Sequence, residues 1–168
     1  MPASDVDLFL DREAAAANNA RLPLRIWLRL LTCTQLIESM VRARLRAEFD
    51  TTLARFDVLA ALDAAGEELT MGALSARLMV TSGNVTGLID AMEQDGLVGR
   101  HAHPSDRRST LIAITSEGQA LFARMAPAHA RWIEEAMATL SRAEGWALWN
   151  ALGRLKNSVL LEKQNGQK

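Results

Sequence analysis

The sequence predicts a mostly α-helical protein with one small β element, that is, a mostly α fold with a small α+β wing. Apolar residues make up 49% of the 168 residues and aromatic residues only 5%, a composition that favours helices. Between residues 70 and 118, two short helical patterns are followed by two short strand patterns around a tight polar turn. This stretch organises the chain, and longer helical patterns flank it on both sides.

The first half of the stretch contains two short helices joined by a polar turn. Thr70 is expected to cap the first helix, whose apolar residues recur three and four apart as far as Leu78. The second helix has one buried face, formed by Val85, Leu88, Ile89 and Met92. Asp95-Gly96 ends it, because glycine readily adopts a left-handed backbone conformation.

The second half reads as a β-hairpin. Residues 97–103 and 109–115 are the expected strands, and the connection between them contains Arg107 and Arg108. Two short helices followed by a hairpin with a basic tip form a winged helix-turn-helix. Such a unit places its second helix, called the recognition helix, in the major groove of DNA and its hairpin against the adjacent backbone or minor groove. The pattern therefore predicts DNA binding.

Several residues of this stretch form a pattern that resembles the MarR (multiple antibiotic resistance regulator) family. The pattern is carried by Val85, Thr86, Leu88, Asp95-Gly96-Leu97-Val98, Arg100, Asp106, Arg108, Thr115 and Gly118. The resemblance implies a homodimeric transcription factor, usually a repressor, that a small ligand or oxidation releases from its operator.

The expected organisation is one MarR-type domain over residues 1–168. Its winged helix-turn-helix core spans about 53–118, and long dimerisation helices flank it at about 22–48 and 119–163. The flanking helices carry more apolar surface than a small winged domain can cover, so we expect a second subunit to cover the rest. A two-fold dimer would place its two recognition helices roughly 34 Å apart and require a pseudo-palindromic operator.

Charge and cysteine content limit the function further. The formal net charge is −1, so DNA contacts must come from a local cluster of arginines rather than from overall charge. Cys33 is the single cysteine, which indicates a reducing compartment. No apolar run is long enough to cross a membrane, and the first residues lack the features of a signal peptide. We expect a cytoplasmic protein.

The predicted DNA contacts lie in the hairpin tip and the recognition helix. Arg107 and Arg108 are the candidate contacts at the tip: Arg108 is expected to enter a narrow minor groove, with Asp106 holding its guanidinium. Residues 82–95 contain no Lys or Arg, so base reading falls to neutral residues. The neutral candidates are Ser82, Asn84 and Thr86, and Arg77 is the candidate phosphate clamp. The alternatives are a solvated turn for the arginines and simple helix capping for Ser82 and Asn84.

The resemblance also implies an effector site between the first helix, the second helix and the helix after the hairpin. Trp27, Phe56, Arg46 and His129 come from these helices and would suit an aromatic carboxylate or its thioester. The alternative is ordinary core packing for Trp27 and Phe56 and a solvated position for Arg46. No cofactor is expected.

Three other functions are weaker. Cys33 as an oxidation sensor lacks supporting tyrosines, and we expect it to be a small buried core residue. His101 and His103 lie two apart on a strand without an obvious third ligand, so a metal site is not expected. An enzyme is not expected, because the sequence offers no nucleophile–base pair, no phosphate-binding loop and no set of metal ligands. A winged-helix protein-interaction module without DNA binding remains the other alternative.

Overall fold

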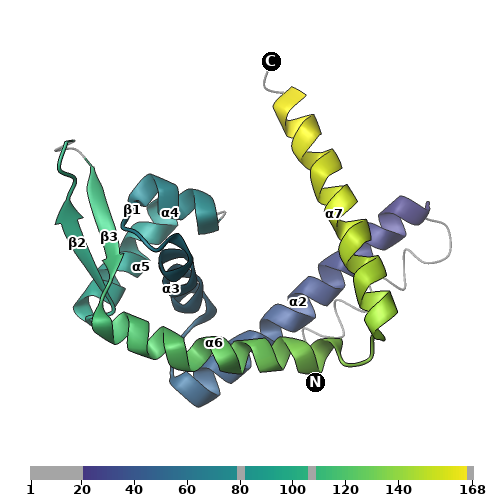
Figure 1. The fold of residues 1–168 in the computed structure, drawn as a ribbon, viewed down its shortest axis with the longest axis horizontal. Coiled ribbons are helices and arrows are strands. Elements are labelled where there is room, and N and C mark those ends of the chain that lie inside the picture. The colour runs from purple at the N-terminus through teal and green to yellow at the C-terminus, as the bar shows by residue number, and fades with distance from the viewer. Residues whose placement is uncertain (1–20, 79–81, 106–108, 166–168) are drawn as a thin grey trace, which may run out of the picture. The chain divides into compact units, whose positions relative to one another are not determined.

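The computed structural model describes residues 21–78, 82–105 and 109–165. The elements are α2 (Leu22–Phe49), α3 (Leu53–Ala65), β1 (Leu69–Thr70), α4 (Met71–Leu78), α5 (Ser82–Gln94), β2 (Val98–Ala102), β3 (Thr110–Ile114), α6 (Ser116–Met137) and α7 (Arg142–Asn165) (Figure 1). The described residues form two compact units, one up to residue 130 and one from residue 131 onward, and α6 contributes residues to both. The predicted mostly helical fold with a small sheet is confirmed.

The helix boundaries follow local capping chemistry. The hydroxyl of Thr52 accepts a hydrogen bond at the start of α3, and Gly66 ends this helix with a φ of 65°. The hydroxyl of Thr70 accepts a hydrogen bond of 3.2 Å from the backbone N–H of Ala73, as the sequence predicted. Gly96, with a φ of 71°, follows α5.

The sheet has three antiparallel strands in the order β1-β3-β2. The hairpin strands were predicted correctly, each one residue longer at both ends than observed. Strand β1 was not predicted from the sequence; in it Leu69 pairs with Ile112 and Thr70 with Leu111. Two residues are too few to show a strand alternation, so this strand is defined by its partner rather than by its own pattern.

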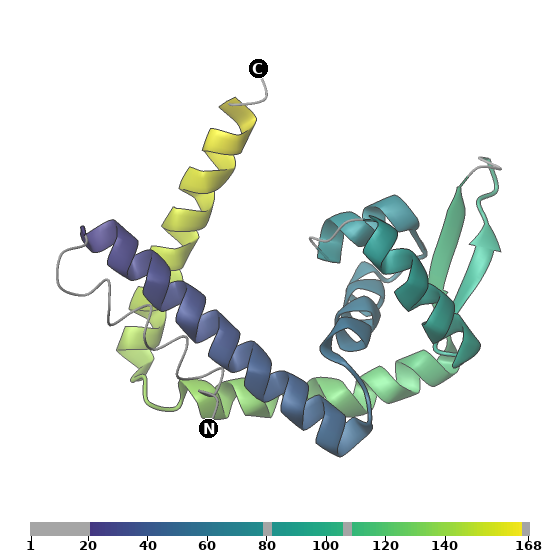
Figure 2. The ribbon, with the colours of Figure 1, turned by 180° about the vertical axis from the view of Figure 1, so that it is seen from behind.

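The core of the first unit lies where α3, α4, α5, α6 and the sheet converge, an arrangement seen from both sides in Figures 1 and 2. Five side chains of this core, one from each element, are fully buried: Leu59, Leu74, Ile89, Ile112 and Met125. Burying each stabilises the fold by about 1.5–3 kcal/mol. The predicted apolar face of α5 is confirmed, with Val85, Ile89 and Met92 buried and Leu88 half-buried.

A close backbone crossing fixes the base of the hairpin. The Thr115 hydroxyl donates to the carbonyl of Gly96 at 2.6 Å and accepts from the N–H of Gly118 at 3.0 Å. A Cβ on Gly118 would lie 2.1 Å from the Leu97 carbonyl oxygen and 2.9 Å from Cγ1 of Ile114. Only glycine fits here, so the first turn of α6 is held against the start of β2.

The second unit consists of the end of α6 and α7. A capping box begins α7: the Glu144 carboxylate accepts from the Ser141 N–H at 2.9 Å, and the Ser141 hydroxyl accepts from the Glu144 N–H at 3.4 Å. The Ser141 hydroxyl also donates to the Glu144 carboxylate at 2.6 Å, and this bond, followed by the bond from the Ser141 N–H, lowers the pKa of Glu144. Beyond this cap, α7 exposes an apolar series: Trp146, Leu148, Trp149, Leu152, Leu155, Val159, Leu160 and Leu161.

Within the part of the chain that the structure describes, none of the helices combines the length and apolarity needed to cross a membrane.

The crossing at Gly118 predicts the effect of a single methyl group. We expect Gly118→Ala to lower the free energy of unfolding by about 3 kcal/mol, because a backbone carbonyl cannot rotate away from the added Cβ as a side chain can. Urea denaturation measures this loss. Gly72→Ala is the matched control: its Cβ would meet nothing within 4 Å, so its stability should equal or slightly exceed that of the wild type. Equal stability of the two variants would contradict the prediction.

Candidate DNA interface

The elements that would meet DNA are α4, α5 and the β2–β3 hairpin. α4 and α5 pack against each other and against α3, and β2 packs against α5, so the recognition helix and the hairpin belong to one body. Strand β2 pairs with strand β3 along its whole length, from Val98 opposite Ile114 to Ala102 opposite Thr110. This arrangement is that of a winged helix-turn-helix.

The structure describes the predicted DNA contacts only in part. Thr86 lies exposed on α5, and Arg77 lies exposed in the last turn of α4. Ser82 and Asn84 lie in the first turn of α5, but their side chains are outside the described residues, as are Asp106, Arg107 and Arg108 of the hairpin tip. The roles assigned to these residues therefore stay predictions.

A set of ion pairs around the recognition helix gives no signal in the sequence. Arg100 on β2 donates to Glu93 at 2.6 Å and also to Asp90, two carboxylates that lie one turn apart on α5. The two carboxylates raise the pKa of Arg100. At the end of α5, Asp95 pairs with Arg55 of α3 at 2.6 Å. The acidic residues at positions 90, 93 and 95 all face an arginine from another element.

The hairpin carries the two histidines that raised a metal question. His101 lies 3.7 Å from a carboxylate oxygen of Glu68, and Nδ1 of His103 lies 3.3 Å from the Ser105 hydroxyl. The two rings thus have different neighbours. Among the described residues, no group of three or more metal-ligating side chains is present.

The predicted effector residues separate into two places. The ring centroids of Phe56 on α3 and His129 on α6 lie 4.7 Å apart, and those of Phe56 and Phe122 lie 5.6 Å apart, with the rings tilted in both pairs. Trp27 and Arg46 both lie on α2 and are exposed. They are 19 residues apart in one continuous helix, which at 1.5 Å per residue means a separation of about 28 Å. Phe56 and His129 are brought together, whereas Trp27 and Arg46 do not share one small site within a subunit.

A polar cluster that the sequence did not indicate lies beside this aromatic group. Asp57 on α3 interacts with Glu38 and Arg42 of α2, which pair with each other, and with His129 of α6. Burial, and then the negative charge of Glu38, raise the pKa of the Asp57 carboxyl, while His129 and Arg42 oppose that rise. The cluster around Asp57 could not be predicted, because a single acidic residue on a helix gives no signal in the sequence.

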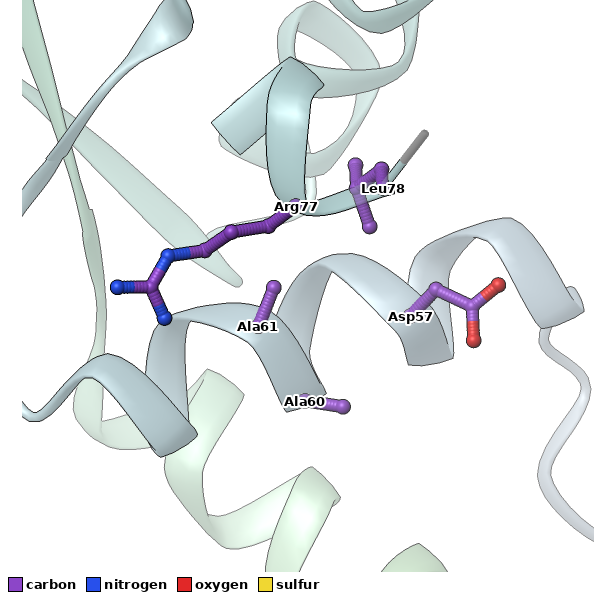
Figure 3. Close-up of a pocket in the computed structure, with 5 residues that line it drawn as sticks. All are labelled: Asp57, Ala60, Ala61, Arg77 and Leu78. Atoms are coloured by element: carbon purple, nitrogen blue, oxygen red, sulfur yellow. The ribbon is translucent and has the colours of Figure 1, made fainter. Parts of the chain in front are cut away.

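Asp57 also lines a groove of about 400 Å³ between α3 and α4, together with Ala60, Ala61, Arg77 and Leu78. Figure 3 shows that the Arg77 side chain extends along α3 past Ala61, whereas the Asp57 carboxylate points to the opposite side. One wall of the groove, formed by Arg77 and Leu78, is the last turn of α4, the first helix of the helix-turn-helix.

The predicted burial of Cys33 is wrong. We expected a small buried core residue, but Cys33 is exposed on α2. The run of apolar residues around it suggested burial, yet one face of α2 is not covered by its own subunit.

The position of Asp57 makes its charge unfavourable for folding. A carboxyl whose pKa is raised in the folded state contributes stability that is complete below its ordinary value of 3.8 and is lost as the pH rises through the folded-state pKa. We therefore expect Asp57→Asn to be modestly more stable than the wild type at neutral pH and equal to it below that value. Urea denaturation across a pH series measures the difference.

The control is Asp63→Asn, one to two turns later in the same helix, which should change stability little at any pH. A neutral-pH stability of Asp57→Asn at or below that of the wild type would refute the prediction.

Comparison with known proteins places this geometry in a family. Residues 49–109 match the MarR family model. The chain is similar to the HTH-type transcriptional repressor YetL of Bacillus subtilis, with 34% identity over 102 residues that cover 60% of this chain and 61% of YetL. It is also similar to the transcriptional activatory protein BadR of Rhodopseudomonas palustris, with 35% identity over 107 residues, 62% of this chain and 61% of BadR. The chain thus spans about three fifths of these two relatives.

Among solved structures, BpsR of Bordetella bronchiseptica superposes with a TM-score of 0.70 at 23% identity, covering 79% of this chain and 98% of BpsR. This likeness confirms the fold. The relatives are named as transcriptional regulators and not as enzymes. The matching family model, these relatives and the winged helix-turn-helix geometry agree: residues 49–109 of the chain form a segment that matches the MarR family.

Proposed function

We propose that this protein is a DNA-binding transcriptional regulator that acts as a homodimer on a pseudo-palindromic operator and responds to a small-molecule effector. The observation that carries the proposal is the α4–α5 pair followed directly by the β2–β3 hairpin, whose connection contains two arginines in the sequence. α5 would lie in the major groove and the hairpin against the neighbouring minor groove. Repression is the favoured direction because YetL is named a repressor, although BadR is named an activatory protein.

The proposed homodimer rests on exposed apolar surface. Besides the apolar series of α7, the start of α2 exposes Leu22, Leu24, Ile26 and Trp27. Four or more large apolar side chains on one exposed helix are costly in water, and obligate dimer interfaces are built from such surfaces. A second copy of the chain is the partner we propose for both helices. Two-fold symmetry would then present two recognition helices to two operator half-sites.

The hairpin tip supplies the first test. We expect Arg108→Ala to weaken operator binding at least a hundredfold, because the guanidinium would be lost from the narrow minor groove, where the negative potential is strongest. Gel-shift titration on the DNA upstream of the protein's own gene, over a salt series, measures the loss. Arg131→Ala, on α6, removes one exposed arginine elsewhere and should leave affinity nearly unchanged. Wild-type affinity in a folded Arg108→Ala protein would sink this assignment.

For the effector we propose a small aromatic carboxylate or its thioester. Phe56, Phe122 and His129 supply an aromatic wall, and the DNA binding of BpsR is described as regulated by 6-hydroxynicotinic acid. The ligand must bind better to a dimer whose winged units are wrongly spaced for DNA. A coupling of about 3 kcal/mol would change DNA affinity by over a hundredfold.

A thermal-shift screen of aromatic acids and their coenzyme A thioesters tests the effector class, with each hit carried into the gel-shift assay. We expect a hit to raise the melting temperature of the wild-type protein and to dissociate its DNA complex. Phe56→Ala should lose the response while keeping its DNA binding. The exposed Cys33 provides the competing outcome: dissociation by peroxide that Cys33→Ser abolishes, with no response to any aromatic acid, would favour oxidation sensing instead.

A further inference from the structure

The recognition helix carries the wrong charge for a DNA-binding surface. α5, Ser82–Gln94, contains Asp90 and Glu93 and no Lys or Arg. Val85, Ile89 and Met92 form the buried face of the helix. Gly87 and Asp90, three residues apart, are exposed on the opposite side. Two uncompensated carboxylates there would repel the phosphates that the helix must approach.

The structure places one arginine against both carboxylates. Arg100 extends from β2, where its backbone pairs with Ile112 of β3. One terminal nitrogen of its guanidinium lies 2.6 Å from Glu93, and the other contacts Asp90. Its side chain is 28% exposed, against 50% for Asp90 and 38% for Glu93, so the guanidinium is the most enclosed of the three groups.

We propose that Arg100 is a charge-compensating residue for DNA binding: its guanidinium offsets the charges of Asp90 and Glu93 and so permits α5 to approach the phosphate backbone. The inference rests on the proposed function. It assigns Arg100 no contact with DNA, and the planar guanidinium suits the task because its two terminal nitrogens can serve two carboxylates at once.

This role differs from a purely structural one. Ion pairs between exposed side chains contribute little to folding stability, so the removal of Arg100 should lower the melting temperature by only a few degrees. The repulsion it would release acts on DNA instead. Salt screens that repulsion with a Debye length of about 10 Å at 0.1 M, so the loss of affinity must shrink as salt increases.

The test compares Arg100→Met with the triple variant Arg100→Met/Asp90→Asn/Glu93→Gln. The DNA is a duplex that the wild-type chain selects from a randomised pool. We expect Arg100→Met to bind at least tenfold more weakly at low salt, with a smaller deficit at high salt, and the triple variant to return to within about threefold of the wild type. Arg131→Met is the matched control: it removes one exposed arginine from an ion pair on α6 and should bind like the wild type.

The outcomes separate this inference from the proposed function. Failure of the wild-type chain to select any duplex overturns both. Wild-type binding together with unchanged affinity of Arg100→Met, or with a triple variant as weak as the single one, overturns the inference alone. If Arg100→Met does not fold, Arg100→Lys and the triple variant replace it: both should bind within about threefold of the wild type, and a tenfold loss in either is the contrary result.

Discussion

The first turn of α6 lies against the backbone of Leu97 so closely that position 118 tolerates no side chain. Four segments meet at this crossing: the end of α5, the start of β2, the end of β3 and the start of α6. Thr115 joins them, since its hydroxyl bonds to Gly96 and Gly118 and its N–H donates to Leu97 at 3.2 Å. Because recognition helix and hairpin both depart from this point, their mutual orientation depends on it.

Electrostatics in this protein is local. The formal net charge of −1 gives no general attraction to a polyanion, and the recognition helix is acidic by sequence. The structure resolves part of this conflict through paired arginines, Arg100 against Asp90 and Glu93, and Arg55 against Asp95. These pairs stabilise the fold only slightly, because their side chains are partly exposed. Their main consequence is a recognition surface whose negative charge is largely offset.

The region between α2, α3 and α6 combines aromatic stacking with unfavourable charge. Phe56 and His129 are in ring contact, and Asp57 beside them is held next to Glu38. Local arrangements that carry such a cost can be shifted by a ligand or a proton that relieves it. The adjacent groove, which Asp57 lines, also includes Arg77 and Leu78 in the last turn of α4.

The sequence alone determined the long helix α2, the α4–α5 pair, both hairpin strands, the helical character of residues 119–163 and the likeness to the MarR family, because apolar periodicity, capping residues and left-handed glycines act over a few residues. It did not determine β1, which exists only through its pairing with β3. Nor did it determine the ion pairs of Arg100, the cluster at Asp57, the exposure of Cys33, or the separation of Trp27 from Arg46. Each of these depends on which distant segments pack together, and that packing is decided by the tertiary structure.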